Sequence, residues 1–172
     1  MCLRKGTVTA TEGFEMSDED RITGGCYCGA IRYESTEGPT GRGMCHCRMC
    51  QRWIGVAAIM HVWFDLESFR FTKGEPKTYK TSSILERSFC PECGTSLMHR
   101  YVVPPHGPDR VAIYIGTLDD PQSLGGPQYH FGIESHLPRW MILAEGVSQL
   151  QADGDSRLAE AWAAFPDIET KG

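Results

Sequence analysis

The sequence predicts a mainly β fold, and three observations support this prediction. Apolar and polar residues alternate over short segments, as they do along half-buried strands. Turn sequences rich in glycine and proline separate several of these segments. A convincing helical spacing of apolar residues occurs only near the C-terminus. We therefore expect a mainly β fold, or at most an α+β fold, that is built from several small, coiled β-sheets.

The individual strands follow from local patterns. Residues 30–34 alternate apolar and polar side chains, and residues 56–64 form an apolar run that is short enough for a buried strand. The sequence at 73–76 contains glycine and proline and predicts a turn between two short strands. In chain order, the expected strands are 30–34, 56–64, 69–72, 77–81, 97–103, 111–118, 128–133 and 140–144.

The two ends of the chain differ from this central region. Residues 1–20 are polar, become acidic and lack periodicity, which predicts a flexible N-terminal arm. Residues 156–165 carry apolar side chains at spacings of three and four, which predicts a helix. We expect one zinc-binding domain at 21–150, followed by a C-terminal helix and tail at 151–172.

Composition excludes several classes of function. The chain has 172 residues, is 41% hydrophobic and carries a net charge of −5, which disfavours nucleic-acid binding. No apolar run reaches the roughly 20 residues that cross a bilayer, and the N-terminus does not read as a secretory signal. We expect a cytoplasmic protein. In a reducing compartment, cysteine clusters are more often metal ligands or redox centres than disulfides.

Seven of the eight cysteines fall into three clusters, which are Cys26 and Cys28, then Cys45, Cys47 and Cys50, then Cys90 and Cys93. Thiolates at such spacing can converge on one soft cation. Four ligands close a tetrahedral zinc shell, whereas three leave a position open. Seven thiols therefore divide as four and three, which predicts one closed and one open zinc site. The eighth cysteine, Cys2, lies in the expected arm.

Spacing alone does not fix which clusters share a metal. Combining the Cys26 pair with the Cys90 pair is the economical choice, because each turn then supplies two ligands. Spacing equally allows the triplet to share Cys93 or to gain a histidine, although His46 should point away from a metal that its neighbours hold. A thioredoxin-type role for the Cys90 pair is a weaker hypothesis, since the sequence beyond Gly94 reads as a strand.

Several motifs in the same order resemble the glutathione-dependent formaldehyde-activating enzyme family, which includes centromere protein V-like domains. The resemblance extends from about residue 24 to residue 140. It is carried by GCYCGAIRY at 25–33, CHCRMCQR at 45–52, FCPECGT at 89–95, GTLDDP at 116–121, His130 and Trp140. The chain departs from the family pattern just after the triplet, where the bulky Trp53 is expected to alter the shape of the pocket.

The resemblance implies an Mss4-like fold and two zinc ions per chain. It implies a structural zinc on one set of cysteines and a catalytic zinc on another, namely Cys26, Cys28, Cys90 and Cys93 for the first and Cys45, Cys47 and Cys50 for the second. It also implies a carbon–sulfur lyase related to S-(hydroxymethyl)glutathione synthase. Its partners are then a small thiol such as glutathione and a small aldehyde.

Three thiolates make zinc a weaker Lewis acid than three imidazoles do, so capture of a fourth thiol suits the open site better than activation of water. Such a thiolate adds negative charge, which Arg42, Arg48 and Arg52 are candidates to offset. A non-catalytic, zinc-stabilised binding module is the alternative. Methionine sulfoxide reduction ranks last, because it needs a metal-free reactive cysteine and only Cys2 remains.

Overall fold

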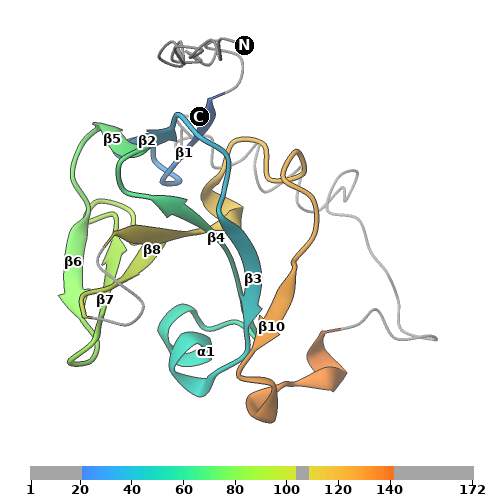
Figure 1. Cartoon of the computed structure of the whole chain (residues 1–172). Helices are drawn as coiled ribbons and strands as arrows, with labels where there is room; N and C mark the ends of the chain where they lie inside the picture. Colours follow the sequence, from blue (N-terminus) through green and yellow to red (C-terminus); the bar gives the residue numbers. More distant parts are fainter. Residues whose placement is uncertain (1–20, 104–108, 142–172) are drawn as a thin grey trace, which may run out of the picture.

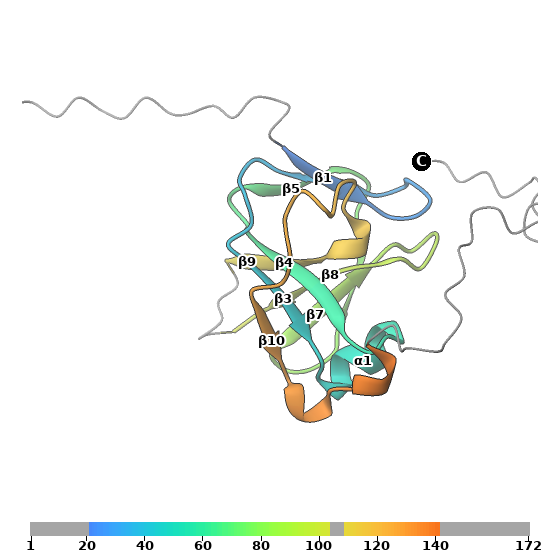
Figure 2. The same ribbon diagram turned by 90° about the vertical axis from the view of Figure 1, so that its right-hand side faces the viewer.

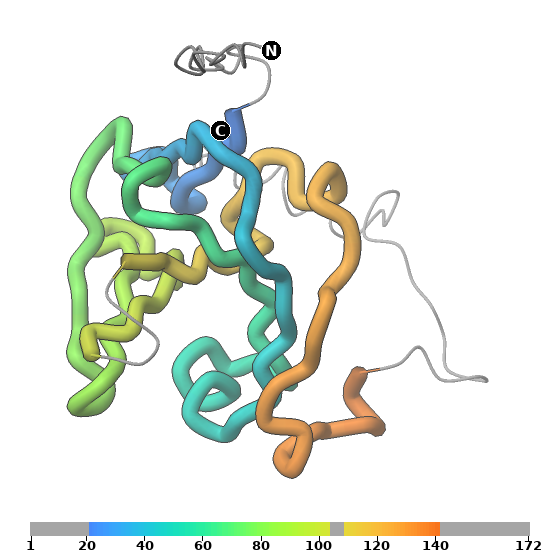
Figure 3. The backbone as a smooth tube through the Cα atoms, viewed as in Figure 1, coloured from blue at the N-terminus to red at the C-terminus, as the bar shows by residue number. Residues whose placement is uncertain are grey.

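The computed structural model describes residues 21–103 and 109–141, and two β-sheets dominate this part of the chain (Figure 1). The smaller sheet has three antiparallel strands in the order β1-β2-β5. These strands are β1 (Ile22–Gly25), β2 (Arg32–Ser35) and β5 (Phe69–Lys73). They lie together at the end of the molecule where the described chain begins (Figure 3).

The larger sheet has seven strands in the order β10-β3-β4-β9-β8-β7-β6. All neighbouring pairs are antiparallel except β10 and β3, which are parallel. The strands in this order are β10 (Tyr129–Phe131), β3 (Gly41–Cys45), β4 (Ile59–Asp65), β9 (Arg110–Tyr114), β8 (Ser96–Tyr101), β7 (Leu85–Phe89) and β6 (Lys77–Lys80).

The helical segments of the described chain are short. The helix α1 (Arg48–Ile54) ends at Gly55, whose φ of +80° is a left-handed conformation that favours glycine. Three 3₁₀ turns follow later in the chain, η2 (Ile115–Thr117), η3 (Ile133–Ser135) and η4 (Pro138–Trp140). Figure 2 shows the segment after β10 turning next to α1, so the two cover the same end of the larger sheet.

The main core lies between the two sheets. Val62 and Phe64 of β4 are buried there with Val111 and Ile113 of β9, and Tyr33 of β2 packs against them from the smaller sheet. Successive side chains of a strand point to opposite faces, so the residues between these core positions face the other side of the larger sheet. That second face carries polar and aromatic side chains rather than a second sheet.

The prediction of a mainly β fold is confirmed. The structure has strands within or overlapping the expected segments at 30–34, 56–64, 69–72, 77–81, 97–103, 111–118 and 128–133. Residues 115–117 form a 3₁₀ turn rather than the end of a strand, and residues 138–140 form another where a strand was expected to begin. The predicted arm at 1–20, the remainder of the strand at 140–144 and the helix at 156–165 lie outside the described residues.

The sequence analysis did not predict three strands and the helix of the described chain, namely β1, β3, β7 and α1, or the 3₁₀ turn η3. Two of these missed elements, β3 and α1, carry the cysteine triplet. Within residues 21–103 and 109–141, no helix is long and apolar enough to cross a membrane.

Candidate metal centres and the adjoining cavity

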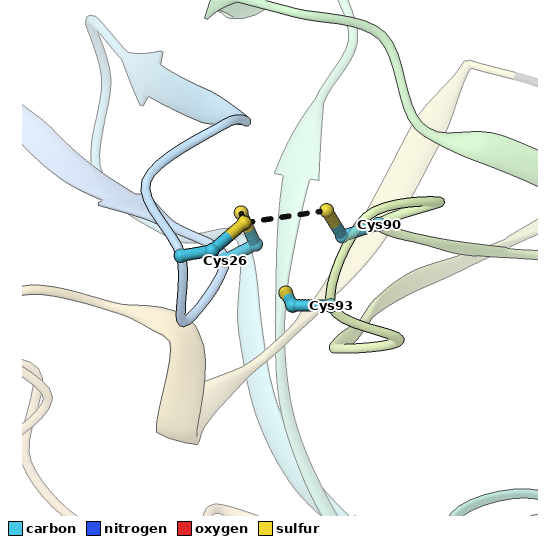
Figure 4. Close-up of side chains that lie close together, drawn as sticks. Cys26, Cys90 and Cys93 are labelled. Atoms are coloured by element: carbon cyan, nitrogen blue, oxygen red, sulfur yellow. Dashed lines mark hydrogen bonds between the residues drawn. The ribbon is translucent and has the colours of Figure 1, made fainter. Parts of the chain in front are cut away.

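Four cysteines from two distant turns meet in the core. Cys26 and Cys28 lie between β1 and β2, whereas Cys90 and Cys93 lie between β7 and β8. Their sulfur atoms all lie within 4.8 Å of one another. Figure 4 shows the labelled side chains from the two turns pointing toward a common centre. The structure therefore brings together the four residues that the economical pairing combined.

Glycines and backbone amides shape these two turns. Gly29 and Gly94 each follow the second cysteine of a pair directly. Their φ values of +68° and +75° let the chain reverse tightly at these positions. The amide of Gly94 donates a hydrogen bond to the carbonyl of Cys90 at 2.9 Å. The amide of Ile31 donates to Sγ of Cys26 at 3.2 Å, and such bonds favour the thiolate form that metals require.

This four-cysteine cluster is part of the hydrophobic core. Cys90 is fully buried, and Cys26 is 7% exposed among apolar side chains of both sheets. Four thiolates complete a tetrahedral shell by themselves, so an ion at this position has no place for an exogenous ligand. The arrangement has the character of a closed site that ties two turns of the fold together.

The other three cysteines meet where β3 runs into α1. Cys45 is the last residue of β3, Cys47 precedes the first helical residue, and Cys50 lies in the first turn of α1. Residues three apart lie on the same side of a helix, so Cys47 and Cys50 face one another. The three sulfur atoms lie within 4.8 Å of one another, and Sγ of Cys45 is 3.4 Å from Sγ of Cys47.

The triplet has three candidate ligands in the described part of the chain. Within residues 21–103 and 109–141, no histidine or carboxylate joins the three sulfurs. His46 points elsewhere, because its Nε2 lies 2.9 Å from Nδ1 of His130 in a hydrogen bond. Cys93 belongs to the other cluster. The arrangement therefore leaves a tetrahedral ion one protein ligand short.

Ionisation within the triplet is uneven. The pKa of Cys50 is lowered to about 6, chiefly by its hydrogen bond with Cys45 and to a smaller extent by Cys47 and Arg87. The same hydrogen bond and burial raise the pKa of Cys45. Cys50 therefore ionises before Cys45, and a cation is needed to hold both as thiolates.

Arg87 of β7 places a positive charge in contact with one of these sulfurs. Its side chain is fully buried, and its Nη2 donates a hydrogen bond to Sγ of Cys50 at 3.3 Å. Its Nη1 donates to Oγ1 of Thr81, and its guanidinium lies over the ring of Trp53 at 5.7 Å. The bulky Trp53 thus covers the buried arginine and also stacks on Tyr79.

Sequence reasoning missed Arg87, although one signal for it exists. The segment at 85–89 alternates, with Leu85 and Phe89 in phase with Arg87. In a strand this phase places the arginine on the same face as its apolar neighbours. An arginine in a buried phase requires a partner, and Cys50 supplies one from 37 positions earlier in the chain.

The triplet opens into a cavity of about 490 Å³ on the second face of the larger sheet. Strand pairing brings the residues at the floor of this cavity together. Arg87 of β7 pairs with His99 of β8, and His61 of β4 pairs with Gly43 of β3 and with Tyr114 of β9. Volume and lining are in the range of small-molecule sites. Besides the three cysteines, the polar and aromatic lining residues that matter below are His61, Trp63, Arg87, His99, Tyr101 and Tyr129.

Two histidines on the floor of the cavity are held neutral. Burial lowers the pKa of His61 to about 4, and burial with the neighbouring His61 lowers the pKa of His99 well below its ordinary value. Their ring centroids lie 5.4 Å apart. At neutral pH both rings therefore act as uncharged hydrogen-bonding groups.

The arginines singled out from sequence separate in space. Arg48 and Arg52 line a second hollow of about 430 Å³, which shares Met49 and Arg87 with the main cavity. Arg42 instead donates a hydrogen bond from Nε to the carbonyl of Gly126 at 3.1 Å. Arg42 does not line either hollow.

The residue after Cys50 has a structural role. Gln51 is 4% exposed, and its Nε2 contacts the carbonyl oxygens of His46 at 2.7 Å and Ser135 at 2.9 Å. These contacts hold α1 against the segment that follows β10. The amide of His46 adds a backbone bond to the carbonyl of Phe131 at 2.8 Å. Gln51, the residue directly after the triplet, thus helps to fix the position of the triplet.

The fold and the two cysteine clusters define a mainly β protein with two candidate metal centres, one enclosed in the core and one open to a cavity. The chain belongs to the glutathione-dependent formaldehyde-activating enzyme family, whose model matches residues 21–135. That range covers both clusters and every strand of the larger sheet. The predicted family resemblance is confirmed.

Individual relatives are distant. The chain is similar to an uncharacterized lyase of Schizosaccharomyces pombe, with 31% identity over 78 residues that make up 45% of this chain. The match spans 56% of the length of that relative. A crystal structure of a Rhodobacter sphaeroides protein is also similar, with 22% identity, a TM-score of 0.49 and coverage of 62% of this chain and 98% of the other.

Proposed function

We propose that the protein is a zinc-dependent carbon–sulfur lyase that joins a small thiol such as glutathione to a small aldehyde such as formaldehyde, and reverses this step. The observation that carries the proposal is the cysteine triplet, which lacks a fourth side-chain ligand among the described residues and faces a cavity of about 490 Å³. Family membership supports the same substrates.

The donor sets fit zinc. Cys26, Cys28, Cys90 and Cys93 form an all-sulfur set of the kind found in structural zinc sites, and Cys45, Cys47 and Cys50 form a three-sulfur set. A zinc ion at the triplet supplies a position at which an incoming thiol loses its proton and stays nucleophilic. We therefore assign the first set to structure and the second to the reaction.

The protein itself supplies charge balance for an incoming thiolate. Arg87 is buried beside the triplet and cannot lose its proton, so it offsets the negative charge of the sulfur that it contacts. A fourth thiolate increases that charge. The contact between Arg87 and Cys50 therefore contributes most when the thiol is bound.

The neighbouring hollow suits the rest of glutathione. Arg48 and Arg52 line it, and its boundary with the cavity is formed by Met49 and Arg87. Guanidinium groups bind carboxylates through paired hydrogen bonds. With the thiol at the triplet, we propose that a glutathione carboxylate binds between Arg48 and Arg52.

Exchange NMR of glutathione with formaldehyde tests the proposed reaction. Zinc-loaded protein is expected to accelerate interconversion of the free thiol and its S-hydroxymethyl adduct, whereas Cys47→Ser, which removes one sulfur of the triplet, is expected to abolish the acceleration. Equal exchange rates with and without wild-type protein would rule out this substrate pair. A bound but unreacted thiol would instead support the non-catalytic binding module.

A further inference from the structure

Tyr129 crosses a neighbouring strand to reach the floor of the cavity. It lies on β10 and pairs in register with Gly43 of β3, which in turn pairs with His61 of β4 (Figure 2). A Cβ added at Gly43 would lie 2.3 Å from the Tyr129 ring. The absence of a side chain at Gly43 is therefore what lets the phenol ring pass over β3 and place its hydroxyl at β4.

The Tyr129 hydroxyl meets two nitrogen atoms of β4. Nε1 of Trp63 donates a hydrogen bond to Oη of Tyr129 at 2.7 Å, and Nε2 of His61 lies 3.0 Å from the same oxygen. The indole nitrogen is a donor only, so the direction of the first bond is fixed. The second depends on which nitrogen of His61 carries the hydrogen.

The contacts of His61 favour one tautomer. The backbone of Ile59 interacts with the ring and partly opposes the lowering of its pKa, but Nδ1 is buried without a hydrogen bond of normal geometry. A buried N–H without an acceptor is rare and costly in proteins, so we assign the hydrogen to Nε2, where Oη of Tyr129 accepts it. Burial keeps the ring neutral, with a pKa lowered to about 4. Tyr129 thus accepts two N–H bonds and keeps its own O–H hydrogen uncommitted by either of them.

This hydroxyl shares a cavity with the triplet. Tyr129, His61 and Trp63 line the same 490 Å³ space as Cys45, Cys47 and Cys50. Cys45 lies two residues beyond Gly43 on β3, which places it on the same face of the sheet at a distance on the order of 7 Å along the strand. A small aldehyde bound between the two sites can contact both a thiolate and the phenol.

We propose that Tyr129 is the catalytic acid that protonates the aldehyde oxygen as the carbon–sulfur bond forms, a role that rests on the function proposed above. The thiolate sulfur bonds to the aldehyde carbon, and the carbonyl π electrons move to oxygen. That oxygen takes the proton from Oη of Tyr129. Tyr129 then regains the proton that the thiol released on binding, so thiol and aldehyde give the S-hydroxymethyl adduct without another reagent.

His61 and Trp63 are positioning residues in this scheme. Their N–H groups point at the oxygen on which charge develops when Tyr129 gives up its proton, and preorganised donors of this kind stabilise such charge. In the reverse direction the same oxygen takes the proton back from the adduct hydroxyl, and the carbon–sulfur bond breaks. Neutral His61 donates throughout and does not carry the transferred proton.

Tyr129→Phe tests the role of the hydroxyl, because it removes Oη and keeps the ring over Gly43. The catalysed exchange rate of glutathione and formaldehyde is expected to fall by roughly 100-fold, as is usual for loss of a general acid. The dissociation constant for glutathione and the zinc content are expected to stay at their wild-type values. Tyr79→Phe, on β6 and outside the cavity lining, is the matched control.

His61 separates a donor role from a proton-carrying role. His61→Gln retains an N–H donor and is expected to keep most of the catalysed rate, whereas His61→Leu is expected to lose it. Nitrogen NMR of the wild type is expected to show the Nε2–H tautomer of His61. A wild-type rate in Tyr129→Phe, or the Nδ1–H tautomer, would overturn this role for Tyr129. Absence of catalysis in the wild type would instead overturn the proposed function.

Discussion

Nη2 of Arg87 donates a hydrogen bond to Sγ of Cys50 across 3.3 Å, and both side chains are buried at 0% and 5% exposure. A buried guanidinium requires a counter-charge, and buried thiolates require the same in return. The two residues come from β7 and α1. Their contact therefore couples the charge of the triplet to the packing of the larger sheet.

Arg87→Met is expected to weaken metal binding at the triplet by roughly 10- to 100-fold, as for loss of other groups that support metal ligands. The four-cysteine cluster is expected to retain its metal, because its sulfurs do not contact Arg87. Chelator competition with measured zinc content distinguishes the two sites. Arg87→Lys should recover part of the affinity by restoring charge.

The matched control is Arg100→Met, which removes an arginine of the neighbouring strand that pairs with Glu86 at 3.4 Å. It should leave both metal sites at full occupancy. Loss of the same metal in both arginine variants would show that sheet integrity, and not the charge beside Cys50, controls the triplet.

Serine substitutions should separate the two cysteine clusters. Cys90→Ser removes a fully buried sulfur from the core and is expected to lose one zinc and most of the folding stability, since structural zinc contributes on the order of 10 kcal/mol. Cys47→Ser is expected to lose one zinc and remain folded. Urea unfolding with elemental analysis measures both effects. Global unfolding of Cys47→Ser would make the triplet a structural site.

His61 should make stability depend on pH. Its pKa is lowered from 6.5 to about 4 by burial, so the unfolded chain binds a proton in this range and the folded chain does not. Stability is therefore present above about pH 6.5 and lost as the pH falls toward 4, by roughly 3 kcal/mol in total. Over this pH range, the free energy of unfolding of His61→Gln is therefore expected to fall less than that of the wild type.

This comparison cancels the effects that both proteins share. Titration of groups remote from position 61 occurs in both proteins, so the difference between their urea unfolding free energies at each pH reports on His61 and on the part of the His99 pKa shift that His61 causes. If the unfolding free energies of the two proteins change in parallel between about pH 6.5 and about pH 5, His61 titrates in the same way in the folded and unfolded states.

Gly43→Ala should displace Tyr129 without removing any functional group. The added Cβ lies 2.3 Å from the phenol ring, so the ring must move away from His61 and Trp63. We expect a changed indole N–H resonance for Trp63 and a lower exchange rate. Gly41→Ala on the same strand is the control. Its added Cβ meets Trp63 at 3.4 Å and does not meet Tyr129, so it shows how the Trp63 resonance responds to a nearby methyl group when Tyr129 is not displaced. An unshifted resonance in Gly43→Ala would mean that the ring does not depend on Gly43.

Replacement of Arg48 and Arg52 together by glutamine should weaken glutathione more than a thiol without carboxylates. The loss for glutathione is expected to be roughly tenfold, from one charge-assisted contact. The dissociation constant of 2-mercaptoethanol should not change, because it reaches only the triplet. Calorimetric titration measures both thiols, and equal losses for the two would argue against a carboxylate site between these arginines.

The ligand clusters were visible in the sequence because each forms within a few residues. The short spacings of Cys26 with Cys28 and of Cys90 with Cys93 follow from single turns, and only their combination is a long-range property. Buried arginine and phenol partners are different. Arg87 reaches Cys50 from 37 positions away, and Tyr129 reaches His61 from 68 positions away, so strand order and register decide these contacts.

The missed elements have local causes. The strand β3 contains two glycines in five residues, and glycine is depleted in strands, yet Gly43 is what admits Tyr129. The strand β7 carries Arg87 in a buried phase, which obscures its alternation. The helix α1 has seven residues and is held by Gln51 and by the cysteine cluster, so propensity gives little sign of it.

The most direct test of two unequal sites is X-ray absorption at the zinc edge, recorded before and after glutathione is added. Seven protein sulfurs around two ions predict an average of about 3.5 sulfur neighbours per zinc, rising to about 4 with the thiol bound. Four protein ligands at both ions and a spectrum unchanged by glutathione would contradict the account.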